Sequence, residues 1–145
     1  MQVAPKWSGY TTCEAVPALF SPQPKLIVVS EFYKSKFRWD KVELDILSSL
    51  AHEIGHALDH CLKGVSNTAR FKETYKADHG RLNTVDKSRL AYFIQNKSKA
   101  GRKETFAEIF SSVVAKSHRT DIEQKFPETA KLVREVLSDK VSIAK

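Results

Sequence analysis

A chain of 145 residues, 41% of them hydrophobic, is long enough for one domain with a hydrophobic core and too short for two. Its formal net charge of +7 favours acidic partners, such as nucleic acid, an anionic membrane or an acidic immunity or inhibitor protein, without choosing among them. The two cysteines, Cys13 and Cys61, exclude a disulfide framework and a cysteine-rich zinc site. No apolar run approaches the roughly 18 residues that span a bilayer, so we expect no membrane span.

The N-terminal part of the chain changes in composition near residue 24. Residues 1–24 are rich in Pro, Ser, Thr and Gly, and we interpret them as an N-terminal arm that packs back onto a domain of residues 25–145. Residues 25–30 are a short β-branched run, which predicts a strand. Residues 32–39 are either a second short strand or a loop, and Asp40 is placed to cap the next helix.

The next helix is predicted to end near Gly64 and to be amphipathic. At about 100° per residue, its apolar residues gather on one side: Leu44, Leu47, Leu50, Ile54, Leu58, Cys61 and Leu62. The other side carries Asp45, Ser49, His52, His56 and Asp59. We therefore expect the apolar stripe, with Cys61 as a small core residue, to pack into a core and the polar stripe to face a cleft. A Cys13–Cys61 disulfide stays open as an alternative.

The polar stripe contains the motif His52-Glu53-Ile54-Gly55-His56. Two histidines four residues apart project from one face of a helix, so both imidazoles can bind one zinc ion, and the glutamate between them is placed to act as a general base. This pattern is typical of zinc metallopeptidases. The alternative is a surface helix with two solvated histidines, which does not explain Glu53.

The rest of the chain is predicted to be mostly helical, with helices near residues 68–79, 86–96, 103–117 and 127–138. Two histidines leave a catalytic zinc ion in need of one more protein ligand and an open position. Glu104 and Glu108 share one face of the third of these helices with small residues, so either could reach a metal held by another helix. A solvated acidic face is the alternative.

The two motifs together resemble the catalytic domain of the anthrax lethal-factor type of zinc metallopeptidase, whose relatives include proline-specific endopeptidases. The sequence HEIGHALD at residues 52–59 matches the family pattern His-Glu-x-x-His with Gly before the second histidine and Ala-x-Asp after it. ETFAEIF at residues 104–110 matches Glu-x-Phe-Ala-Glu. The resemblance covers roughly residues 25–118 and implies a mostly helical α+β, zincin-like domain with a small sheet beside the active-site helix.

The resemblance also implies roles for individual residues. Zn2+ would be bound by His52, His56 and Glu104, and Glu53 would be the general base. Two further acids, Asp59 and Glu108, would each orient a ligand histidine.

One position departs from the family pattern. Members of the family carry a tyrosine about two turns before the ligand glutamate, where its hydroxyl can stabilise an oxyanion, whereas Lys97 stands seven residues before Glu104. Tyr92 is the nearest upstream tyrosine, and it is the candidate for this catalytic role. A core aromatic residue is the alternative interpretation of Tyr92.

We therefore expect a zinc-dependent endopeptidase that acts on a protein or peptide, and the small size with the resemblance favours the toxin domain of a longer bacterial effector that is secreted or translocated. A strand edge near residues 25–30 could pair with an extended substrate. One alternative is a DNA-repair type of metalloprotease, with His79 or His118 as the third ligand. Another is a nucleic-acid-binding protein that uses the basic cluster Lys97, Lys99, Arg102 and Lys103, but no recognisable binding motif supports it, so nucleic acid is not expected as a partner.

Overall fold

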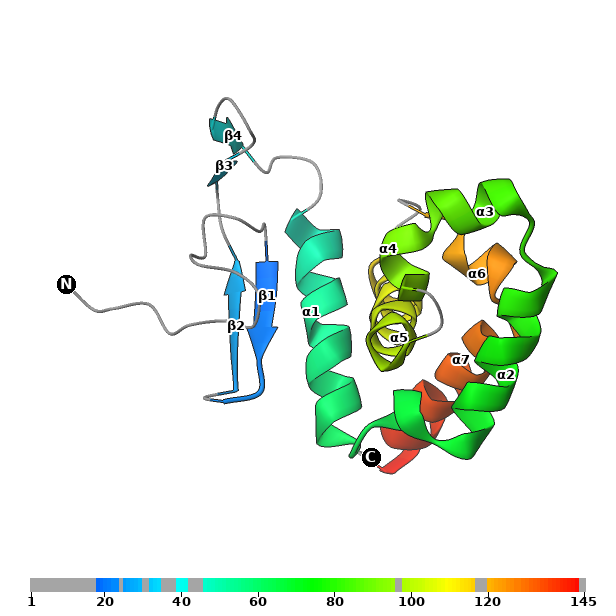
Figure 1. Ribbon diagram of the computed structural model, residues 1–145. Coiled ribbons are helices and arrows are strands. Elements are labelled where there is room, and N and C mark those ends of the chain that lie inside the picture. Colours follow the sequence, from blue (N-terminus) through cyan, green and yellow to red (C-terminus); the bar gives the residue numbers. More distant parts are fainter. Residues whose placement is uncertain are drawn as a thin grey trace.

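One long helix, α1, separates a β-hairpin from the other helices of the chain (Figure 1). The structure is a computed structural model, and it describes residues 18–23, 25–29, 32–34, 39–41, 46–95, 98–116 and 120–143. The elements are β1 (Ala18–Ser21), β2 (Leu26–Val29), β3 (Phe32–Lys34), β4 (Trp39–Lys41), α1 (Ile46–Cys61), the 3-10 helix η2 (Val65–Asn67), α2 (Ala69–Arg81), α3 (Thr84–Arg89), α4 (Ala91–Ile94), α5 (Lys99–Ala115), α6 (Ile122–Lys125) and α7 (Pro127–Ile143). The predicted mostly helical α+β class is confirmed. Among the described helices, none is long and apolar enough to cross a membrane.

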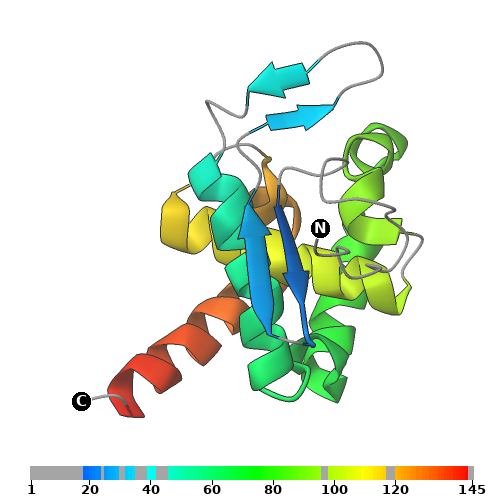
Figure 2. The same ribbon diagram turned by 90° about the vertical axis from the view of Figure 1, so that its left-hand side faces the viewer.

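The strands form two antiparallel pairs, β1 with β2 and β3 with β4. The strand predicted at residues 25–30 is confirmed as β2. β1 falls within the segment expected to be an arm, and it pairs with β2 in the register Phe20 opposite Ile27. Asp40 lies in β4 and does not cap α1, which begins at Ile46. The β1–β2 hairpin packs along α1 on the side opposite α5 (Figures 1 and 2).

The helix boundaries follow local capping chemistry. Thr68 precedes α2 and its hydroxyl oxygen accepts a hydrogen bond from the Phe71 amide, as expected of an N-cap. Ser98 caps α5 in the same way, so this helix begins earlier than predicted. The helix predicted at residues 86–96 is divided into α3 and α4 at Leu90. The short helix α6 was not predicted, because four residues are too few for a periodic pattern.

Helix α5 lies at the centre of the helical part and contacts α1, α4, α6 and α7. The buried hydrophobic core around it consists of Phe71, Tyr75, Leu82, Leu90, Ile94, Phe106, Ile109, Ile122, Phe126, Ala130, Leu132 and Val133. The α5 residues from Thr105 to Ser112 are all buried, including Glu108. The acidic side of α5 is therefore not a solvated face.

The predicted orientation of α1 is wrong in part. Leu47 is 73% exposed and Ile54 is 39% exposed, whereas His52 and Glu53 are buried. Cys61 is also exposed and is not a core residue, while Leu44, Asp45 and Cys13 lie outside the described residues. Periodicity separates the two faces of a helix correctly, but here the polar face packs against α5.

A close contact between small residues explains this orientation. A Cβ atom added to Gly55 would lie 2.8 Å from the Ala107 Cα and 3.1 Å from its carbonyl oxygen, so the backbones of α1 and α5 nearly touch. One turn along α5, the Ser111 hydroxyl donates to the carbonyl oxygen of Ser48 at 2.9 Å. The small and polar face of α1 is the one that allows this approach, and Figure 2 shows α5 crossing behind α1.

We expect Gly55→Ala to destabilise the protein by about 1–3 kcal/mol, because the added methyl group meets backbone that cannot move without separating the helices. Thermal or urea unfolding measures this change. Gly80→Ala is the matched control, since Gly80 lies in α2 with nothing within 4 Å of an added Cβ. Alanine favours helix over glycine by up to about 1 kcal/mol, so the control should be neutral or stabilised. Equal stability of the Gly55 and Gly80 variants would contradict the close packing.

Candidate metal centre

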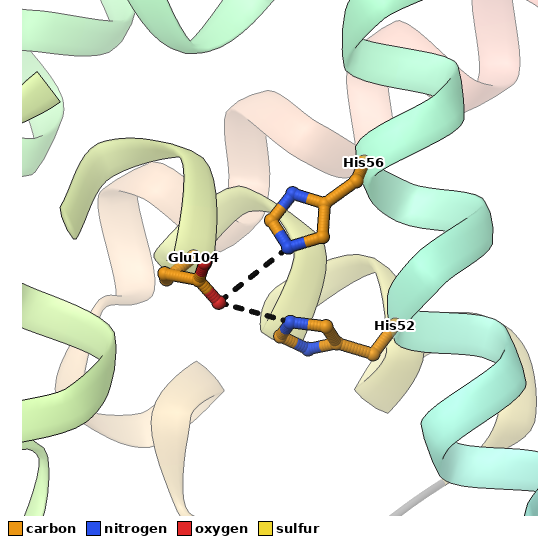
Figure 3. A group of neighbouring side chains, drawn as sticks. All are labelled: His52, His56 and Glu104. Atoms are coloured by element: carbon orange, nitrogen blue, oxygen red, sulfur yellow. Dashed lines mark hydrogen bonds and ion pairs between the residues drawn. The ribbon is translucent and has the colours of Figure 1, made fainter. Parts of the chain in front are cut away.

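The crossing of α1 and α5 brings three potential metal ligands together (Figure 3). His52 and His56 project from one face of α1, and Glu104 projects toward them from α5. One carboxylate oxygen, Oε2 of Glu104, lies 3.1 Å from His52 Nε2 and 3.5 Å from His56 Nε2. One ligand atom from each residue lies within 4.8 Å of the others. In the part of the chain that the structure describes, this is the only such group of three.

A second carboxylate, that of Glu108, fixes the other side of the His52 ring. Its Oε2 lies 2.9 Å from His52 Nδ1, and the side chain is only 2% exposed. An Nδ1–H that donates to a carboxylate fixes the ring orientation and directs Nε2 toward the metal position. Glu108 is therefore placed to orient the His52 ring, and Glu104 is the acid that meets both histidines.

The buried Glu53 carboxylate is held by the hairpin. Its Oε2 accepts a hydrogen bond from the backbone amide of Phe20 at 2.5 Å. The Phe20 N–H therefore points away from β2 and toward α1. This contact couples the position of β1 to the glutamate of the HEIGH motif.

Asp59 does not occupy the place that the resemblance implied. Both of its carboxylate oxygens accept hydrogen bonds from Ser66, from the amide at 2.8 Å and from the hydroxyl at 2.7 Å. The chain reverses at Gly64, with φ of 84°, and this turn brings Ser66 back to the last turn of α1. Arg102 of α5 also donates to the carbonyl oxygen of Ser66. The hydrogen-bond partner of Asp59 is therefore Ser66 and not a histidine, and Asp59 stabilises the turn between α1 and η2.

Tyr92 and His79 lie in different surroundings. Tyr92 is 58% exposed, so it is not a core aromatic residue, and its ring packs edge-on against Phe93. The Phe93 ring is 6.2 Å from that of His52, which places Tyr92 next to a residue that contacts the cluster. His79 is buried in α2 against Tyr75 and is not part of the His52 cluster. His118 and Lys97 lie outside the described residues.

The pKa values of the cluster follow from burial and opposing charge. Burial alone lowers the pKa of His52, but the hydrogen bonds and charges of Glu104 and Glu108 outweigh it and raise the pKa from 6.5 to about 9. Burial tends to raise the pKa of Glu104, yet hydrogen bonds to His52 and His56 and their charges lower it from 4.5 to about 2. At neutral pH His52 is therefore protonated when no metal competes for it.

Two contacts of the site were not predicted from the sequence. The Phe20 amide is backbone and leaves no pattern of residue types. Thr120 donates to Glu108 Oε1 at 2.9 Å, but it follows the end of α5 in a segment without helical periodicity. No local sequence pattern predicts either contact, because each depends on how segments that are distant in the sequence pack together.

The pKa values predict how pH affects the stability of protein stripped of metal with a chelator. The His52 contribution is complete below pH 6.5 and is lost as the pH rises toward 9, because the folded state holds the proton more tightly than the unfolded chain. The Glu104 contribution is complete above pH 4.5 and is lost as the pH falls toward 2. We expect Tm to fall between pH 6.5 and 9, with a smaller fall for His52→Ala. Equal falls in both proteins would show that this cluster does not govern the effect.

Comparisons with known proteins identify the family. Residues 3–136 match the family model for the anthrax toxin lethal factor, N- and C-terminal domain. No curated protein and no solved structure matched the chain. The family match is much longer than the two motifs and includes the hairpin, α1, α5 and most of α7. The chain therefore belongs to the anthrax toxin lethal factor N- and C-terminal domain family.

Proposed function

We propose that this domain is a zinc-dependent endopeptidase. The observation that carries the proposal is the meeting of His52, His56 and Glu104 at one point, with Glu53 on the same helix as the two histidines. The family model describes both the N-terminal and the C-terminal domain of lethal factor, so membership alone does not assign catalysis. The proposal therefore rests on the residues of this chain.

The donor set fits zinc. Two imidazole nitrogens and one carboxylate oxygen are the ligands of one common class of catalytic zinc site, which keeps a further position open. The contact between Glu108 and His52 Nδ1 leaves Nε2 as the ligand atom of that ring, and Nε2 is the atom that faces Glu104. When bound, zinc supplies a Lewis acid that polarises a carbonyl and lowers the pKa of water.

The chain's own residues would perform the proton transfers and orient the groups. Glu53 would accept a proton from the attacking water and return it to the leaving amine, and the Phe20 amide would hold its carboxylate in place. Glu108 would keep the His52 ring in a productive orientation. Tyr92, beside Phe93, would donate a hydrogen bond to the developing oxyanion.

The hairpin supports an extended peptide as the substrate class. The Phe20 N–H is directed to the active-site helix and not to β2, so one edge of β1 borders the glutamate of the motif. That edge of β1 is taken by the contact with Glu53, so we propose that an extended peptide adds to β2, the strand of residues 25–30, and forms main-chain hydrogen bonds there. We also propose that the domain is the toxin part of a secreted or translocated effector, because the family is named for a toxin. The net charge of +7 supports an acidic immunity or inhibitor protein as a partner.

Metal analysis tests the ligand set. We expect purified wild-type protein to bind about one zinc ion per chain and Glu104→Ala to bind much more weakly, because two imidazoles alone leave the site without its third ligand. Glu73→Ala is the matched control, since Glu73 is an exposed glutamate of α2. Elemental analysis after dialysis provides the measurement. Full zinc content in Glu104→Ala would overturn the assignment of Glu104, and no zinc in the wild type would overturn the proposed function.

Substitution of the base separates metal binding from catalysis. Glu53→Gln removes the proton acceptor but keeps the shape of the side chain, so we expect unchanged zinc content and a loss of cleavage on the order of 10²–10⁴-fold. A peptide library analysed by mass spectrometry for new termini supplies the substrate and the rate. If Glu53→Gln cleaved the best wild-type substrate at a comparable rate, Glu53 would not be the general base.

A further inference from the structure

The buried carboxylate of Glu108 is held from both sides. Its Oε2 lies 2.9 Å from His52 Nδ1, and its Oε1 accepts a hydrogen bond from the Thr120 hydroxyl at 2.9 Å. Glu108 is 2% exposed, so water cannot readily replace a protein donor at this position. A continuous series of contacts therefore leads from Thr120 through Glu108 to the ring of His52.

The position of Thr120 is fixed by its neighbours in the chain. Asp121 pairs with Arg89 at 3.3 Å, and Ile122 is fully buried in the hydrophobic core. The segment that leads into α6 is thereby attached to α3 and to the core. The Thr120 hydroxyl is consequently held against α5 by contacts on its C-terminal side.

We propose that Thr120 is a positioning residue of the metal centre, which acts through Glu108 on His52; this rests on the proposed zinc function. A carboxylate bonded at both oxygens cannot rotate about its last side-chain bond without losing one contact. Loss of the Thr120 bond would remove one of the contacts that limit this rotation and would loosen the orientation of the His52 ring. Groups that orient metal ligands from behind typically change metal affinity or activity by about 10–100-fold when they are removed.

The test compares two substitutions that separate hydroxyl from shape. Thr120→Val keeps the shape and removes the hydroxyl, whereas Thr120→Ser keeps the hydroxyl. We expect zinc affinity, measured by competition with a chromophoric chelator, to fall on the order of tenfold in Thr120→Val and to stay near the wild-type value in Thr120→Ser. The absorption bands of the cobalt-substituted protein should shift in the valine variant only, because they report ligand geometry.

Thr74→Val is the control for loss of a threonine hydroxyl elsewhere. The Thr74 hydroxyl donates to backbone carbonyls within α2, and its loss should leave zinc affinity and the cobalt spectrum unchanged. If Thr120→Val prevents folding, Thr120→Ala removes the same hydroxyl with less bulk at Cβ.

The outcomes distinguish this inference from the proposed function. Wild-type zinc affinity in Thr120→Val, or a loss that Thr120→Ser shares, would overturn the positioning role while leaving the zinc site intact. Failure of the wild type to bind zinc would overturn both. A loss confined to the variants without the hydroxyl would support the inference.

Discussion

The near-contact between Gly55 of α1 and Ala107 of α5 is the constraint on which the candidate site depends. The side chains of His52 and His56 are too short to reach Glu104 across a helix pair separated by bulky residues. Glycine in a helix interior costs up to about 1 kcal/mol relative to alanine, so its presence at the crossing is explained by packing and not by helix propensity. The same approach buries the polar face of α1 and leaves Leu47 and Ile54 exposed.

A face of ionisable groups that is buried in this way needs internal partners, because an unpaired charge in the interior is costly. His52 is paired with Glu104 and Glu108, and the latter also binds Thr120. Each of these two acids stabilises the protonated imidazole of His52. Glu104 and Glu108 raise the pKa of His52, so a metal ion that bound this ring would compete with a proton. Metal binding at neutral pH should therefore release a proton.

Much of this arrangement could be predicted from the sequence. The spacing of His52 and His56 predicted a shared helical face, and the acidic and small residues of α5 indicated a partner helix; the structure brings these residues together. Periodicity could not decide which face of α1 meets α5, so the exposure of Cys61 was missed. The small residue Gly55 was the one feature of the sequence that indicated which face of α1 contacts α5. The hydrogen-bond partners of Asp59 and Glu108 could not be predicted from the sequence. Ser66 and Thr120 reach these acids through turns whose paths depend on tertiary packing.

Zinc K-edge X-ray absorption of the zinc-loaded protein reports the ligand atoms around the ion, so it is the direct test of the proposed ligands His52, His56 and Glu104. We expect two imidazole ligands and oxygen ligands, with the spectrum altered in Glu104→Ala. A sulfur ligand, a third imidazole in place of the carboxylate, or a spectrum that Glu104→Ala leaves unchanged would contradict it.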